Sequence, residues 1–160
     1  MQANQDEKLK ILDFLDPNAI AAELTATTKV AVLEELVALL SKGGKVADAK
    51  TTVNVLIDRE KLGSTGIGQG IAIPHAKTDQ AKEVVAAFGL SRRGVQFDAL
   101  DGEPVNIFFL LVAPPEAAAL HLKALARISR LLKDKFFRQS LRETRTAQDI
   151  LKLIKDEDKY

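Results

Sequence analysis

The sequence predicts an α/β fold. We expect a single domain spanning residues 1–160, with three layers, in which a mixed β-sheet is flanked by helices on both faces. Residues 105–112 form a nearly continuous apolar run, rich in β-branched and aromatic side chains, which is typical of a central strand buried on both faces. Apolar residues recur at helical spacing in 29–41. Helical segments both precede and follow the strand-like ones, which favours a three-layer arrangement.

Periodicity and breaker residues set the expected elements. Helical segments are expected at residues 9–15 (a short turn), 29–41, 47–62, 116–133, 134–144 and 147–155. Strands are expected at residues 20–24, 71–75, 84–90 and 105–112. Asp16-Pro17 should close the first turn, Thr27-Thr28 should cap the helix over 29–41, and Pro114-Pro115 should open the helix over 116–133.

The composition excludes several classes of function. Lys and Arg number 23 against 22 Asp and Glu, so the net charge of +1 gives no general attraction to nucleic acid or to a membrane. No apolar run is long enough to span a bilayer, and the polar start shows no signal peptide. With no cysteine and two histidines, neither a disulfide framework nor a metal site is expected. We expect a cytoplasmic protein without a cofactor.

The segment "GSTGIGQGIAIPHAK", residues 63–77, is rich in glycine and contains a histidine. A dinucleotide-binding loop needs a strand before its glycines and a helix after them. Here the order is reversed, because the helical segment 47–62 precedes and the strand-like IAIPH follows. The spacing is G-x-G-x-G, and no Lys-Ser or Lys-Thr follows the last glycine. Nucleotide binding is therefore disfavoured.

Two interpretations of this segment remain. It could be a plain helix-to-strand loop that uses glycine for positive φ angles. Alternatively, His75 is a phosphoryl acceptor, because imidazole is a good nucleophile near neutral pH. Ser64, Thr65 and Gly66 would then supply hydroxyl and backbone donors to the phosphoryl oxygens. Arg59, just upstream, could pair two of these oxygens with its planar guanidinium.

His121 also has two interpretations. At helical spacing it shares a face with Leu125, Ile128 and Leu132, which indicates a packing role. It also lies in the first turns of a helix, where the positive end of the dipole favours neutral imidazole and attracts anions. A neutral, partly buried His121 would donate a hydrogen bond to a phosphoryl group on His75.

Two groups of charged residues also have alternative interpretations. Lys123, Arg127 and Arg130 share one helical face, which is either a solvated face or a docking face for an acidic partner. The acidic residues 98, 101 and 103 indicate a turn before the buried strand, or a contact with a basic donor protein.

The chain resembles a known family. Residues 59–68, "REKLGSTGIG", continue through "GIAIPH" at 70–75, and this stretch resembles the phosphorylation-site signature of enzyme IIA of the phosphoenolpyruvate-dependent phosphotransferase system (PTS), mannitol/fructose type. The resemblance extends through "FDALDGEPVNIFFLLVAP" and "HLKALARISRLLKD". These later segments resemble the nitrogen-regulatory branch more than the sugar-specific one. The family fold is a mixed sheet with helices on both faces.

The resemblance implies roles for three residues. His75 matches the phosphoaccepting histidine, modified on Nε2, and Arg59 and His121 match its supporting arginine and second histidine. The implied donor is the histidine-containing phosphocarrier protein, and regulatory or transport proteins are the implied targets. Ala76 stands where the family often has glycine.

Three functional hypotheses follow. The first is a phosphocarrier of the nitrogen-regulatory kind, whose phosphorylation state is a signal. The second is a sugar-specific (fructose or mannitol) enzyme IIA that passes the group to a separate IIB protein. The third is a regulatory binding module with little transfer.

Overall fold

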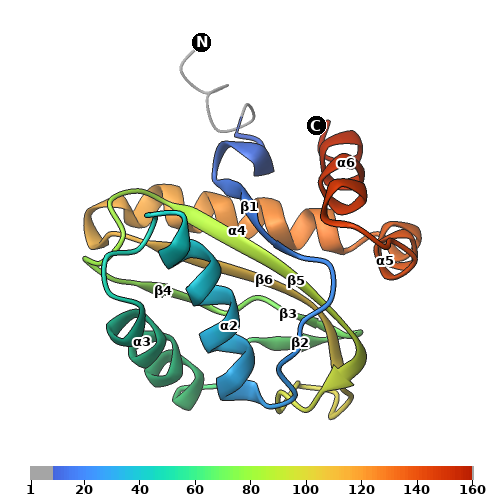
Figure 1. The fold of residues 1–160 in the computed structure, drawn as a ribbon, viewed down its shortest axis with the longest axis horizontal. Coiled ribbons are helices and arrows are strands. Elements are labelled where there is room, and N and C mark those ends of the chain that lie inside the picture. The colour runs from blue at the N-terminus through green and yellow to red at the C-terminus, as the bar shows by residue number, and fades with distance from the viewer. Residues whose placement is uncertain (1–8, 160) are drawn as a thin grey trace.

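The computed structural model describes residues 9–159, so residues 1–8 and Tyr160 of the predicted domain lie outside the described part. Within 9–159 a six-stranded mixed sheet lies between two layers of helices (Figure 1). The strands are β1 (Leu15–Ala21), β2 (Gly66–Gly68), β3 (Ile71–Ala72), β4 (His75–Lys77), β5 (Val85–Val95) and β6 (Val105–Ala113). The α-helices are α2 (Lys29–Lys42), α3 (Ala49–Lys61), α4 (Ala118–Leu132), α5 (Lys135–Arg142) and α6 (Ala147–Glu157). The short 3₁₀ turns are η1 (Ile11–Asp13) and η2 (Pro115–Ala117).

The strand order is β1-β5-β6-β3-β2, and β4 also pairs with β6. The β5–β6 and β2–β3 pairs are antiparallel, whereas β1–β5, β3–β6 and β4–β6 are parallel. The two short strands β3 and β4 therefore follow one another along the same side of β6. Because β6 has partners on both sides, its neighbours are held in a fixed register along its length.

The side chains of β6 divide the core into two halves. Ile107, Phe109 and Leu111 pack with α4, α5 and α6, while residues 108, 110 and 112 pack with α2 and α3. Figure 1 shows α2 and α3 on the near face of the sheet and α4 on the far face. The alternation explains the continuous apolar run, because a strand covered on both faces has no solvent-facing side. The predicted three-layer mixed α/β fold is confirmed.

Local polar contacts set the helix boundaries. Thr28 caps α2 by accepting the Ala31 amide at 3.2 Å, as predicted, and Asp48 caps α3 by accepting the Lys50 amide at 3.1 Å. The predicted helix over 47–62 therefore starts two residues later. The predicted helix over 116–133 is preceded by η2, and α4 begins at Ala118.

Two expectations near the first strand are wrong. Asp16-Pro17 does not close a helical turn, and the strand predicted at 20–24 is β1, at Leu15–Ala21. The register of β1 shifts between Leu15 and Ile20. Because β1 is an edge strand with an irregular register, it accommodates Pro17, which has no N–H to donate.

The strand expected over 71–75 is also divided. β3 ends at Ala72, and β4 starts at His75, so His75 opens a strand and does not end one. The glycine segment itself contains β2, which forms an antiparallel pair with β3. The intervening turn has positive φ at Gly68 (101°), Gln69 (59°) and Gly70 (79°), a conformation that favours glycine. No helix within residues 9–159 is both long and apolar enough to cross a membrane.

Candidate functional site

His75 is held at the start of β4, on the side of β6 opposite β5. It lies in register with Leu111, whose N–H donates to the carbonyl of Pro74 at 2.8 Å. Pro74 also restricts its own φ angle. The backbone that carries His75 is therefore fixed by the central strand of the sheet.

One hydrogen bond defines which nitrogen of His75 is available. Nδ1 lies 2.8 Å from the carbonyl oxygen of Ile73. Because a carbonyl only accepts, Nδ1 carries the hydrogen in neutral imidazole, and Nε2 has the free lone pair. Burial lowers the pKa of His75, and the Arg59 guanidinium lowers it further against the hydrogen bond to Ile73. The ring is therefore neutral and nucleophilic at pH 7.

His121 faces His75 from α4. The two ring centroids are 5.8 Å apart, with the planes at 73°. His121 is only 4% exposed, and its Nε2 is buried with no hydrogen-bond partner among the described residues. Burial lowers the pKa of His121 to about 4, with a further contribution from His75. A neutral ring with an unpaired nitrogen is thus held beside His75.

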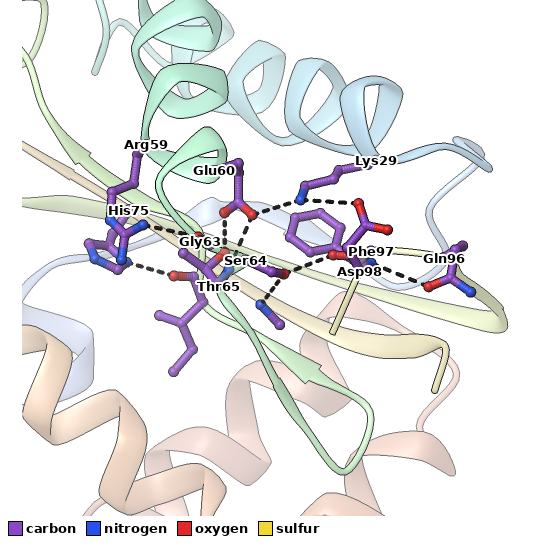
Figure 2. A network of polar contacts seen from close by, with 12 residues as sticks. Lys29, Arg59, Glu60, Gly63, Ser64, Thr65, His75, Gln96, Phe97 and Asp98 are labelled. Carbon is purple, nitrogen blue, oxygen red and sulfur yellow. Dashed lines mark hydrogen bonds and ion pairs between the residues drawn. The ribbon is translucent and has the colours of Figure 1, made fainter. Parts of the chain in front are cut away.

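Arg59 reaches this place from the last turn of α3. Its Nη1 donates to the carbonyl oxygen of Gly63 at 3.0 Å, and the guanidinium lies next to the His75 ring (Figure 2). The structure thus brings together the three residues predicted from the sequence, from α3, β4 and α4. A pocket of about 340 Å³ includes all three and is lined by Val55, Asp58, Arg59, Leu62, His75, Ala76, Lys77 and His121.

Lys77 is a site residue that the sequence analysis did not identify. It lines the pocket, and its charge lowers the pKa of both histidines, although it is not the largest cause for either. The signal was present in the sequence. Residues i and i+2 of a strand point to the same face, so Lys77 lies on the same side of β4 as His75.

Ser64, Thr65 and Gly66 are not among the residues that line this pocket. The Ser64 hydroxyl donates to the carbonyl of Phe97 at 2.8 Å and accepts the Gly66 N–H at 3.0 Å. The Thr65 hydroxyl donates to the buried carboxylate of Glu60. Gly66 packs against backbone, because a Cβ there would lie 2.9 Å from the Cα of Ala99. In this structure the three residues therefore hold the loop together, and their contacts with phosphoryl oxygens stay a prediction.

Both interpretations of the basic face on α4 assume exposed side chains, and this is wrong for one of the three residues. Arg127 is buried, and its Nε lies 2.5 Å from the carboxylate of Asp158. The helical face is covered there by the C-terminal segment, which the sequence pattern of α4 alone does not reveal. Among the acidic residues, Asp101 accepts the N–H groups of Gln69 and Glu103, each at 3.0 Å, as a turn residue does.

Comparison with known proteins identifies the family of this chain. Residues 13–157 match the family described as phosphoenolpyruvate-dependent sugar phosphotransferase system, EIIA 2. The nitrogen regulatory protein of Bradyrhizobium diazoefficiens is 40% identical over 148 residues, which cover 91% of this chain and 95% of that protein. The fructose-specific EIIABC component of Bacillus subtilis is 38% identical over 151 residues, and the match covers 94% of this chain but only 24% of that protein.

A solved structure is similar as well. The nitrogen regulatory protein IIA-Ntr from Neisseria meningitidis superimposes with a TM-score of 0.82 at 33% identity, covering 89% of this chain and 97% of that one. The chain therefore belongs to the EIIA 2 family of the phosphoenolpyruvate-dependent phosphotransferase system. The similarity to nitrogen regulatory proteins along nearly their whole length supports the regulatory branch predicted from the sequence.

Proposed function

We propose that His75 accepts a phosphoryl group on Nε2 from the histidine-containing phosphocarrier protein. The observation that carries the proposal is the hydrogen bond from Nδ1 to Ile73, which leaves Nε2 as the ring nitrogen with a lone pair. In the step, the donor's P–N bond breaks and its electron pair stays on the donor nitrogen. A new P–N bond forms at Nε2, while the Nδ1 hydrogen stays in place.

The surrounding groups suit the charge of the transferred group. Arg59 and Lys77 supply positive charge beside His75, where three phosphoryl oxygens would lie. The buried Nε2 of His121, which has no hydrogen-bond partner among the described residues, would donate a hydrogen bond to one of these oxygens. Leu62, 84% exposed at the pocket rim, and the exposed Leu120 and Leu122 beside His121 support docking of a protein donor at this face.

The test is phosphorylation with purified components. Incubation with phosphoenolpyruvate, enzyme I and the histidine phosphocarrier should add one phosphoryl group, and the linkage should be labile in acid and stable in base. A serine or threonine ester would behave differently, and Ser64→Ala is the control that keeps the label. If His75→Ala still accepts the group, the assignment is wrong.

We further propose that the phosphorylation state is a signal read by regulatory or transport proteins in the cytoplasm. Phosphorylation adds a charge of roughly −1.5 to −2 at one surface position, which is enough to change a docking face. The similarity to nitrogen regulatory proteins supports this proposal. A pull-down that compares the unmodified and phosphorylated forms should recover a partner with one form only. Equal recovery with both forms would contradict a signalling role.

A second candidate is supply of a sugar-specific IIB protein. The identity of 38% to a fructose-specific EIIABC component favours it. Transfer of label from phosphorylated His75 to an isolated IIB domain, at a rate comparable with its own enzyme IIA, would support this candidate over the regulatory one.

A further inference from the structure

The residue after Arg59 is a buried carboxylate. Glu60 lies near the end of α3 and is only 8% exposed. Carboxylates are rarely buried unless they are paired and hydrogen-bonded, because leaving water costs a charged group a large free energy. Glu60 does not line the pocket that holds His75, so its burial calls for a different explanation.

Both oxygens of Glu60 have partners (Figure 2). Oε1 accepts the N–H of Thr65 at 3.1 Å, and Oε2 accepts the Thr65 hydroxyl. The ammonium of Lys29, the first residue of α2, lies 3.0 Å from Oε1. The side chain of Lys29 is partly buried, and its Nζ lies 4.8 Å from the centre of the Phe97 ring. The carboxylate thus joins the end of α3, the start of α2 and the loop after α3.

From Glu60 one path of contacts leads to Arg59. The N–H of Gly63 donates to the backbone carbonyl of Glu60 at 3.1 Å, and the carbonyl of Gly63 accepts the Arg59 guanidinium at 3.0 Å. The loop from Gly63 to Thr65 is closed at its far end by the Glu60 carboxylate. The carbonyl that holds the guanidinium therefore lies in a loop whose other end, Thr65, is bonded to the Glu60 carboxylate.

A second path leads to His75. The carbonyl of Thr65 accepts the N–H of Ile73 at 3.0 Å, and the carbonyl of Ile73 holds Nδ1 of His75 at 2.8 Å. Thr65 is thus bound to Glu60 by its N–H and hydroxyl and to the His75 segment by its carbonyl. One carboxylate is connected to both groups that face the phosphoryl site.

We infer that Glu60, with Lys29 as its counter-ion, is a positioning residue that fixes Arg59 and His75 relative to each other for phosphoryl transfer. The inference rests on the proposed function of His75. It assigns Glu60 no contact with the phosphoryl group. The ion pair with Lys29 compensates the buried negative charge of Glu60.

The charge of Glu60 provides a second measurable effect. Burial lowers the pKa of His75, and the negative charge of Glu60 partly opposes this effect. Replacing the carboxylate with an amide should therefore lower the pKa of His75 further. This shift would show that the charge of Glu60 acts at His75, whereas the transfer rate of the folded variant measures the positioning role.

The test compares Glu60→Gln with Glu34→Gln, which removes an exposed carboxylate on α2. For each variant, the single-turnover rate of His75 phosphorylation and the NMR titration of the His75 ring are measured, with circular dichroism to check folding. Glu60→Gln should lower the rate about 10- to 100-fold, as displaced catalytic groups do, and should move the His75 midpoint to lower pH. Glu34→Gln should match the wild type in both.

A folded Glu60→Gln with the wild-type transfer rate would overturn the inference, whatever its His75 titration. If it does not fold, Thr65→Val replaces it, since this change removes one hydrogen bond and keeps the ion pair with Lys29. That variant should slow transfer several-fold, and an unchanged rate would again count against the inference. If the wild type itself takes no label, the proposed function fails, whereas a wild-type transfer rate in folded Glu60→Gln counts against the positioning role alone.

Discussion

At His75, the direction of one hydrogen bond decides which ring nitrogen can react. The Ile73 carbonyl accepts a hydrogen bond from the Nδ1–H group, and burial keeps the ring neutral. His121 adds a second neutral ring whose Nε2 has no partner in the described part of the chain. Both features can be measured at single atoms of the two rings.

The two histidines should titrate at unusually low pH. Because folding lowers both pKa values, the unfolded chain binds protons first as the pH falls below 6.5. Ring-proton NMR should show a His75 midpoint below 6.5 and His121 neutral until the pH approaches 4. The free energy of unfolding should fall over the same range. A normal midpoint for His121 would contradict its burial.

Removing the second histidine should affect transfer more than folding. His121→Ala should lower the phosphotransfer rate about 10- to 100-fold, because a donor to a charged oxygen is lost. The chain should still fold, since the His121 Nε2 makes no hydrogen bond in the described structure. Rapid-quench kinetics measure the rate, and thermal unfolding provides the control. An unchanged phosphotransfer rate would indicate that His121 has only a packing role.

Among the elements, the short hairpin of β2 and β3 depends on a close backbone approach. Gly66 lies against Ala99, and a Cβ would come within 2.9 Å of its Cα. Gly66→Ala should therefore lower the free energy of unfolding by about 1–3 kcal/mol. It should also slow transfer several-fold, because the neighbouring Thr65 supports the His75 segment.

Gly44→Ala is the matched control for that change. Gly44 has a φ of +74° and open space around it, so alanine there should cost about 1 kcal/mol through backbone strain. The change lies in the α2–α3 connection and should leave the transfer rate unchanged. Urea denaturation and single-turnover labelling separate the two effects. Equal transfer rates in the two variants would contradict the role given to the hairpin.

Sequence periodicity predicted the elements that bury a regular face. The cap at Thr28 and the continuous run of β6 followed from local patterns, and both are present. The position of β1 could not be predicted from local patterns, because Pro17 normally interrupts a strand. Only the tertiary structure shows that β1 lies at an edge of the sheet, where proline is tolerated.

The candidate site, like the secondary structure, was predictable in part from the sequence. His75, Arg59 and His121 lie together as expected, since each belongs to a distinctive local pattern. The hydroxyls of Ser64 and Thr65 were expected to face the phosphoryl group, but here they bind Phe97 and Glu60. Their orientation depends on partners distant in space or on a buried charge, and a loop sequence contains no signal for either.

Across the whole molecule, a buried ion pair ties the two ends of the described chain to α4. Asp158 accepts the N–H of Ile11 at 2.5 Å and pairs with Arg127. Asp158→Ala should lower the free energy of unfolding by about 3 kcal/mol, because it leaves Arg127 buried without its partner. Asp156→Ala removes an exposed partner of Lys152 and should cost less than about 0.5 kcal/mol. If chemical denaturation gave similar losses of unfolding free energy for the two variants, it would contradict this role of Asp158.

The most direct test of phosphorylation at Nε2 of His75 is nitrogen-15 and phosphorus-31 NMR of the phosphorylated protein. The phosphoryl group should be bonded to Nε2 of His75, with Nδ1 still protonated and bonded to Ile73. A phosphoryl group on Nδ1, or on any residue other than His75, would contradict it.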